Sequence, residues 1–146
     1  TSTLTSGALI NSAILSLYGQ SKINQLNLPS VEAALAIVGA TPASTSALTN
    51  SDYQQLGAVR FASDCSWDSF NTSGYNDFSL NSAGIDAINK IGNTKFGGRS
   101  AIDLDNGSPN WVASGYTTYV MGYFADQTDT TQDPKLVVTY SVPNLF

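Results

Sequence analysis

Histidine is absent from this chain of 146 residues, and cysteine and methionine each occur once. The absence of histidine excludes a Ser-His-Asp triad, a Cys-His pair and a histidine-ligated zinc ion. Glu32 is the only glutamate, and the aspartates lie mostly in expected turns, where this residue bonds its own backbone. No pair of carboxylates is therefore set apart for the acid and base roles of a glycosidase. We expect a protein that is not an enzyme.

Charge is also scarce, with six lysines and arginines against eleven acidic residues and a net charge of −5. Binding to nucleic acid needs a basic surface that neutralises phosphates, so this class of partner is not expected. No apolar run approaches the ~20 residues of a membrane span, which argues against membrane insertion. The surface must consist mainly of Ser, Thr, Asn and Gln, a composition typical of secreted and virion-exposed β proteins.

Neither a starting methionine nor a basic and apolar leader opens the chain, which begins at Thr1. A secretory leader would show both a basic and an apolar segment. We therefore expect a processed product or a fragment of a longer chain. Its length predicts one domain over residues 1–146, since domains commonly have ~100–150 residues.

The single cysteine, Cys65, excludes a disulfide bond within the chain. It alternates with Val59, Phe61 and Trp67, which indicates a side chain on the inner face of a strand. The alternative is a reactive nucleophile, but such a thiol needs a nearby base and the chain has no histidine. We favour an inert thiol in the core.

Short alternations of apolar and polar residues recur along the chain, with turn residues between them. They predict strands at residues 9–19, 31–40, 58–67, 75–80, 116–125 and 135–141. The alanines of residues 31–40 would also suit a helix, but the length and flanking residues of this segment favour a strand. About seven short strands with one minor helix predict an all-β fold, an antiparallel β-sandwich of jelly-roll type.

The alternation also predicts which side chains face the core. They are Leu9, Ala13, Leu15 and Leu17 in the first strand, Val31, Ala33, Leu35 and Ile37 in the second, Val59, Phe61, Cys65 and Trp67 in the third, Phe78 and Leu80 in the fourth, and Leu136, Val138 and Tyr140 in the last.

Between residues 82 and 91 the period changes to three, as on one side of a helix. The residues that recur are Ile85, Ile88 and Ile91. Asn81 or Ser82 would cap the start of this helix and Gly92 its end. We expect the helix to pack Ile85 and Ile88 against the sandwich and to cover an open end of the core.

Three segments resemble the DNRLRE-type β-sandwich domains. They are "INSAILSLYG" near the start, "YNDFSLNSAGIDAINKIGNTKFGGRS" in the middle and "ADQTDTTQDPKLVVTYS" near the end. This resemblance spans nearly the whole chain and implies a jelly-roll module of extracellular bacterial or archaeal proteins, or of virion-associated proteins. Members usually carry a strand of the pattern R-x-x-L-x-F-D before the stretch that matches "TSTLTSGALINSA". This chain starts after that point, so the resemblance implies either that the strand was cut away or that the fold obtains a strand from elsewhere.

One cluster of oxygen donors is a candidate cation site. Asp103, Asp105 and Asn106 stand close together, and Asp126 begins a neighbouring acidic loop. Hard cations such as calcium prefer carboxylate and amide oxygens, so calcium is the one cofactor that the sequence proposes. The alternative is a tight turn at Asn106-Gly107 with solvated aspartates.

Four aromatic residues in or beside expected loops are candidate glycan ligands. They are Trp111, Tyr116, Tyr53 and Tyr75. Exposed aromatic rings stack on sugar rings, and polar Asn, Asp and Gln residues occur nearby. Aromatic residues of small β domains also fill the core, and this alternative stays open.

The end of the chain is more apolar than an ordinary strand end. Val142, Leu145 and Phe146 follow the last strand, whereas edges normally carry residues that discourage pairing. We expect these residues to contact a neighbouring copy in a repeating assembly or homo-oligomer, or else to fold back on their own domain.

The sequence therefore predicts a non-catalytic structural or adhesive module of an extracellular or virion assembly. A surface filament subunit, a capsid decoration and a fibre domain all fit this description. The alternative is a carbohydrate-binding module attached to an enzyme or adhesin. The expected location is extracellular, on a cell surface or on a virion surface.

Overall fold

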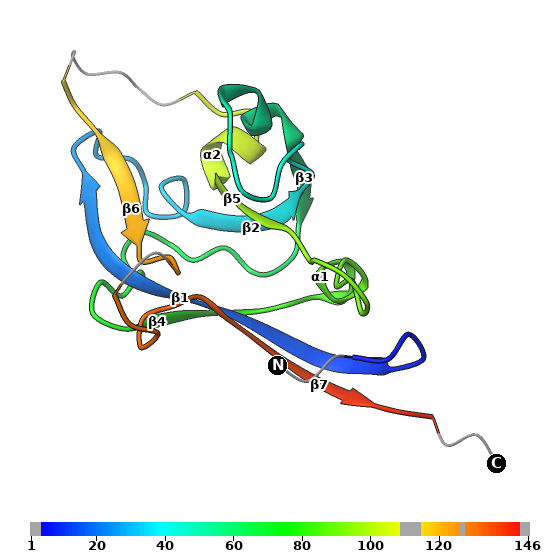
Figure 1. Ribbon diagram of the computed structural model, residues 1–146. Helices are drawn as coiled ribbons and strands as arrows, with labels where there is room; N and C mark the ends of the chain where they lie inside the picture. Colours follow the sequence, from blue (N-terminus) through cyan, green and yellow to red (C-terminus); the bar gives the residue numbers. More distant parts are fainter. Residues whose placement is uncertain (1–3, 109–114, 126–127, 144–146) are drawn as a thin grey trace.

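The computed structural model describes residues 4–108, 115–125 and 128–143 (Figure 1). Strands make up most of its regular structure, and they form two antiparallel sheets. The helices are few and short. The antiparallel, sandwich-like all-β fold expected from the sequence is confirmed. No helix among the described residues is long and apolar enough to cross a membrane.

The first sheet is built around one long strand, β1. β1 (Leu9–Asn24) pairs with β4 (Tyr75–Ser79), β6 (Thr118–Gly122) and β7 (Lys135–Ser141). β7 pairs with residues 9–16 of β1, β6 pairs with residues 19–24, and β4 pairs with residues 14–18. A single strand thus carries two partners in succession along its length, which explains why it continues beyond its expected end at residue 19.

The second sheet has β2 in the centre, with β3 and β5 at its edges. Its strands are β3 (Leu56–Arg60), β2 (Leu35–Ala40) and β5 (Phe96–Ser100). The short helices η1 (Asn50–Gln55) and α2 (Ala101–Leu104) lie next to β3 and β5 in the chain. The apolar–polar alternation did not predict β5, because two consecutive glycines leave this strand without such a pattern. It did not predict the short helices η1 and α2 either.

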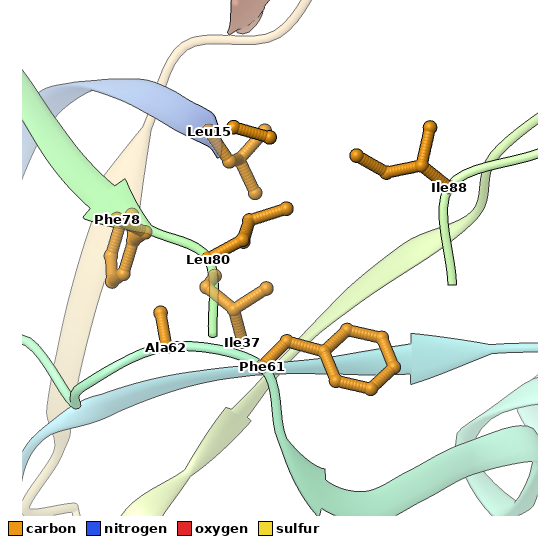
Figure 2. Close-up of a cluster of buried hydrophobic side chains, with 8 residues drawn as sticks. Leu15, Ile37, Phe61, Ala62, Phe78, Leu80 and Ile88 are labelled. Atoms are coloured by element: carbon orange, nitrogen blue, oxygen red, sulfur yellow. The ribbon is translucent and has the colours of Figure 1, made fainter. Parts of the chain in front are cut away.

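The core lies between the two sheets. Figure 2 shows the buried side chains of this cluster, which are Leu15, Ile37, Phe61, Ala62, Phe78, Leu80 and Ile88, and Ala13 belongs to it as well. Phe78 and Leu80 face inward as their alternation predicts. Cys65 is half-buried and packs against this cluster, as expected for an inert core thiol.

The expected helix forms as α1 (Ser82–Asp86). Asn81 caps it, because the Asn81 side chain accepts a hydrogen bond from the backbone N–H of Gly84 at 3.0 Å. This bond satisfies one of the free donors of the first turn. Ile88 is buried and Ile85 packs against the core, so the predicted inner face is confirmed.

The helix is shorter than the isoleucine spacing predicts. It ends at Asp86 rather than near Gly92, and the Ile91 side chain is 80% exposed. The Asn89 backbone N–H donates to the Thr94 hydroxyl at 2.9 Å, and the Asn89 side-chain oxygen accepts from the Ile91 N–H at 3.1 Å. These local bonds replace the next helical turn.

Three side chains expected in the core point to solvent instead. Leu9 is 61% exposed, Val31 is 71% exposed and Val59 is 60% exposed. A bulge between Ile10 and Ser12 shifts the register of β1, and such a bulge reverses the faces on either side of it. Val31 lies in a turn before β2 begins. Val59 lies on β3, but this strand ends at Arg60 and the chain bends at Phe61, so Val59 and the buried Phe61 do not share one face.

The inner face of β7 is also only partly as expected. Val138 packs against the core, whereas Leu136 and Tyr140 are exposed. β7 pairs with β1 alone among the described strands. An edge strand at the end of a sheet has less of the opposite sheet above it, which leaves these two side chains in contact with solvent.

Candidate functional site

An apolar groove lies beside β5 and β6, which belong to different sheets (Figure 1). It consists of two adjoining hollows of about 510 and 450 Å³. Leu35, Gly98 and Val120 line both. Because these residues come from both sheets, the groove is the place where the sandwich is not closed.

The smaller hollow is almost wholly apolar. Among the residues that line it are Leu17, Phe70, Phe96, Val120, Met121 and Phe124. None of the described lining residues of this hollow carries a charge. Exposed apolar surface of this kind is unfavourable in water, so it favours burial against an apolar partner.

The backbone of β2 determines which edge of β5 is open. Leu35 exchanges two hydrogen bonds of 2.9 Å with Cys65, on the side of β3. The Ala40 N–H donates to the Lys95 carbonyl at 3.3 Å, on the side of β5. Since successive residues of a strand point their backbone groups to opposite edges, the even-numbered residues of β2 bond to β5.

The open edge of β5 follows from this alternation. Arg99 pairs with Ala36 and Gly97 pairs with Val38, so Arg99 and Gly97 direct their backbone groups toward β2. Gly98 lies between them and directs its N–H and carbonyl away from β2. Within the described ranges, no residue pairs with this edge.

β6 has an open edge of the same kind. The Gln25 N–H donates to the Thr117 carbonyl, and the Tyr123 N–H donates to the Tyr18 carbonyl, both at 2.9 Å. The odd-numbered residues from 117 to 123 therefore face β1. Val120 directs its backbone groups away from β1, and no strand in the described part of the chain pairs with it there.

A second apolar surface lies at the other end of β1. We call residues 9–13 of β1 together with residues 137–143 the β1–β7 arm; it extends beyond β4, whose partners begin at Ile14 (Figure 1). Leu9, Val137 and Val142 are exposed on it. The arm contains no charged residue. A two-stranded ribbon alone is only marginally stable in water, so packing on another surface would stabilise it.

The structure gives the predicted calcium ligand Asp103 two other partners. Its carboxylate accepts hydrogen bonds from Arg99 Nε at 2.8 Å and from the Tyr53 hydroxyl at 2.9 Å. The bond from Arg99 is the main cause that lowers the pKa of Asp103 below its ordinary value, and Tyr53 adds to it. These contacts hold α2 against β5 and η1.

Asp105 binds a second guanidinium. Arg60 donates to both Asp105 oxygens, each at 2.9 Å, and its Nε donates to Asp64. The bond from Arg60 lowers the pKa of Asp105. Asn106 has a φ of 54°, a left-handed conformation that asparagine adopts in turns.

Asp126 lies outside the described residues. Within the ranges that the structure describes, no three acidic, cysteine or histidine side chains are grouped to hold a metal ion. Asp103 and Asp105 are close in sequence, but each bonds to a different arginine. A calcium ion at this loop would have to displace guanidinium groups, and calcium binding stays a prediction.

The predicted glycan ligands occupy separate places. Tyr116 is exposed and lines the larger hollow, Tyr53 bonds to Asp103 from η1, and Tyr75 lies on β4. Tyr75 donates to two backbone carbonyls, and the Lys135 ammonium lies 3.4 Å from its ring centroid. Trp111 lies outside the described residues.

Sequence reasoning missed a tyrosine cluster on the first sheet. Tyr18 lies 5.0 Å from Tyr75 and 6.0 Å from Tyr123, measured between ring centroids. Tyr18 and Tyr75 are register partners in β1 and β4. Their positions on separate strands gave no signal in the sequence, because the pairing of β1 with β4 could not be read from either segment alone.

Comparisons with models of known families, with curated proteins and with solved structures find no match to this chain. The fold and the groove therefore define its class, which is an all-β, sandwich-like domain with an apolar groove between its sheets.

Proposed function

We propose that this protein is a non-catalytic structural subunit of a repeating assembly outside the cell or on a virion. A surface filament, a capsid decoration and a fibre are all assemblies of this kind. The observation that carries the proposal is the apolar groove with the open strand edges of Gly98 and Val120. A sheet edge with free backbone groups pairs readily with another chain.

The chemistry of the groove supports binding rather than catalysis. Arg99 is the one charged residue among the described residues that line its two hollows, and the Asp103 carboxylate already partners Arg99. No carboxylate is therefore placed there to transfer a proton. Apolar lining and unpaired backbone are features of a surface that another polypeptide covers.

The test is electron microscopy of the purified protein, combined with light scattering over a wide concentration range. We expect repeating copies in the images and a mass that rises with concentration. A chain that stays monomeric at every concentration and shows no repeating particles would contradict the proposal.

Carbohydrate binding is a second candidate, and the position of Tyr116 favours it. Tyr116 is exposed at the larger hollow, where Ser100, Thr117 and Thr118 supply hydroxyl groups. A glycan array would show saturable binding that Tyr116→Ala abolishes. The matched control is Tyr140→Ala, because Tyr140 is an exposed tyrosine that lines neither hollow of the groove. Absence of binding by the unaltered protein would exclude this candidate.

A further inference from the structure

The part of the groove beside β6 and the β1–β7 arm lie at opposite ends of β1. Ser141, the last residue of β7, pairs with Leu9, whereas Val120 in the groove pairs with Lys22. At about 3.3 Å per residue, these two points are roughly 40 Å apart along the strand. Figure 1 shows β1 running from β6 to the far end of β7.

Residues 142–146 cannot reach this part of the groove of their own chain. Residues 142–146 follow Ser141, and five residues span at most about 18 Å when fully extended. The direction of β7 adds to the difficulty, because the chain moves away from β6 between Lys135 and Ser141. The smaller hollow also reaches Leu15, six residues or about 20 Å along β1 from Leu9, which is still beyond this span. We therefore infer that a groove filled by this segment belongs to a second copy.

The chemistry of the segment matches the groove. Val142, Leu145 and Phe146 have apolar side chains, and no side chain from 142 to 146 is charged. Leu145 and Phe146 lie outside the described residues, so they enter the argument by their chemistry alone. The smaller hollow is lined by apolar and uncharged residues as well. Since each copy has a net charge of −5, a contact between two uncharged surfaces avoids repulsion where the copies meet.

The backbone of β5 decides between a peptide and a small apolar molecule. A small apolar molecule would fill the hollow but leave the N–H and carbonyl of Gly98 unpaired. An extended segment would fill the hollow and also bond to these groups. The space beside the α-carbons of Gly97 and Gly98 is filled by Leu56 and Leu35 of the same chain, so the segment would meet β5 at the backbone groups of Gly98 on its open edge. Pro143 lacks an N–H, which restricts the segment to an edge position.

From these observations we propose that residues 142–146 of one copy insert as an extended segment beside β5 in the groove of the next copy. This inference rests on the proposed function and names the partner and the contact surfaces. The donor segment and the acceptor groove are different surfaces, so the contact is heterologous. Contacts of this type produce open filaments or closed rings.

The test uses two variants that break opposite halves of the contact. Deletion of residues 142–146 removes the donor segment, and Met121→Asp places a charge in the acceptor groove. Met121 is exposed, so this change spares the core. The control is Val31→Asp, because Val31 is also an exposed apolar residue but lies outside the groove and the arm. Circular dichroism verifies that each variant is folded.

We expect each variant alone to be monomeric by light scattering, and the Val31→Asp control to assemble like the unaltered chain. Mixing the two variants restores one intact contact, since the deletion variant keeps its groove and Met121→Asp keeps its segment. The mixture should form a pair of chains and nothing larger. Assemblies that persist in both variants would overturn this inference and leave the proposed function standing.

A peptide of residues 135–146 separates the remaining outcomes. We expect saturable binding of this peptide to the deletion variant, and none when Met121→Asp is added or when the peptide is scrambled. If the unaltered chain is monomeric but the peptide still binds the deletion variant, the proposed function is overturned and the contact is supported. Failure of the peptide to bind the deletion variant would overturn the inference.

Discussion

Arg60 and Arg99 organise the acidic loop after β5. Each arginine binds the aspartate that the sequence offers as a cation ligand, Arg99 to Asp103 and Arg60 to Asp105. An arginine fork matches a carboxylate in geometry and charge. The local spacing of the aspartates was visible in the sequence. Arg99 lies only four positions before Asp103, whereas the partner of Asp105, Arg60, comes from the distant strand β3.

The Arg99–Asp103 pair predicts a dependence of stability on pH. The folded-state pKa of Asp103 is lowered, so its contribution is present above the unfolded pKa of about 3.9 and is lost as the pH falls through the lower folded pKa. Asp103→Asn should remove this part of the acid destabilisation. Because the Asp103 side chain is partly exposed, we expect Asp103→Asn to lower the free energy of unfolding by less than about 1 kcal/mol at pH 7.

Urea denaturation at pH 7 and at pH 3 measures this effect. The control is Asp86→Asn, since Asp86 is exposed on α1 and takes no part in the described ion pairs. Equal acid destabilisation of Asp103→Asn and the unaltered chain would show that the ion pair contributes nothing.

Calcium provides a second prediction for the same loop. Because guanidinium groups already bind the carboxylates of Asp103 and Asp105, we expect calcium and a chelator to leave the melting temperature unchanged. The measurement is thermal denaturation in excess calcium chloride and in chelator. A rise in melting temperature with calcium alone would show that the ion displaces the arginines, and it would support the site proposed from the sequence.

At the scale of single elements, the length of β1 depends on a close backbone approach at Gly19. The Gly19 N–H donates to the Gly74 carbonyl at 3.0 Å. A side-chain carbon added at Gly19 would lie 1.9 Å from the Asn71 carbonyl oxygen. Glycine therefore allows β1 to pass the loop of residues 71–74 and continue to its pairing with β6.

Gly19→Ala should destabilise the protein, because the loop or the strand must move to remove this overlap. We expect a loss of about 1–3 kcal/mol in the free energy of unfolding, typical of overpacking. The denaturation midpoint should fall at an unchanged m-value. Gly7→Ala is the control, since nothing lies within 4 Å of a side-chain carbon added at Gly7. Equal midpoints for the two variants would contradict the prediction.

At the scale of the whole molecule, β1 connects the two apolar surfaces. The groove lies beside the middle and the second half of β1, and the arm contains residues 9–13 of β1. Residues 142–146 of one chain cannot reach the part of its own groove beside β6. The length of β1 keeps the groove and the arm apart in one copy, so each surface can contact a different neighbouring copy.

Assembly predicts that thermal stability depends on protein concentration. A partner that binds only the folded chain stabilises it by mass action, so a hundredfold rise in concentration above the dissociation constant should raise the melting temperature by roughly 5–10 °C. The deletion of residues 142–146 should remove this dependence. Calorimetry at several concentrations makes the comparison. A melting temperature that does not change with concentration would argue against assembly.

Features that depend on near neighbours could be predicted from the sequence alone. The period of two gave the all-β class and the strand at residues 135–141, and the isoleucine spacing with Asn81 gave the start of α1. The absence of histidine excluded whole classes of catalysis. Strand alternation, capping and side-chain chemistry act within a few residues, so a single segment contains the information.

The tertiary structure alone decided which segments meet. It placed Arg60 against Asp105, 45 positions away, and it brought β5 and β6 to opposite walls of one groove. It also turned Leu9 and Val31 outward, through a bulge and a turn that alternation does not reveal. Such pairings depend on closing long loops and on competition among many apolar surfaces for the same core. No short segment contains that information, because the partners become neighbours only when the whole chain folds.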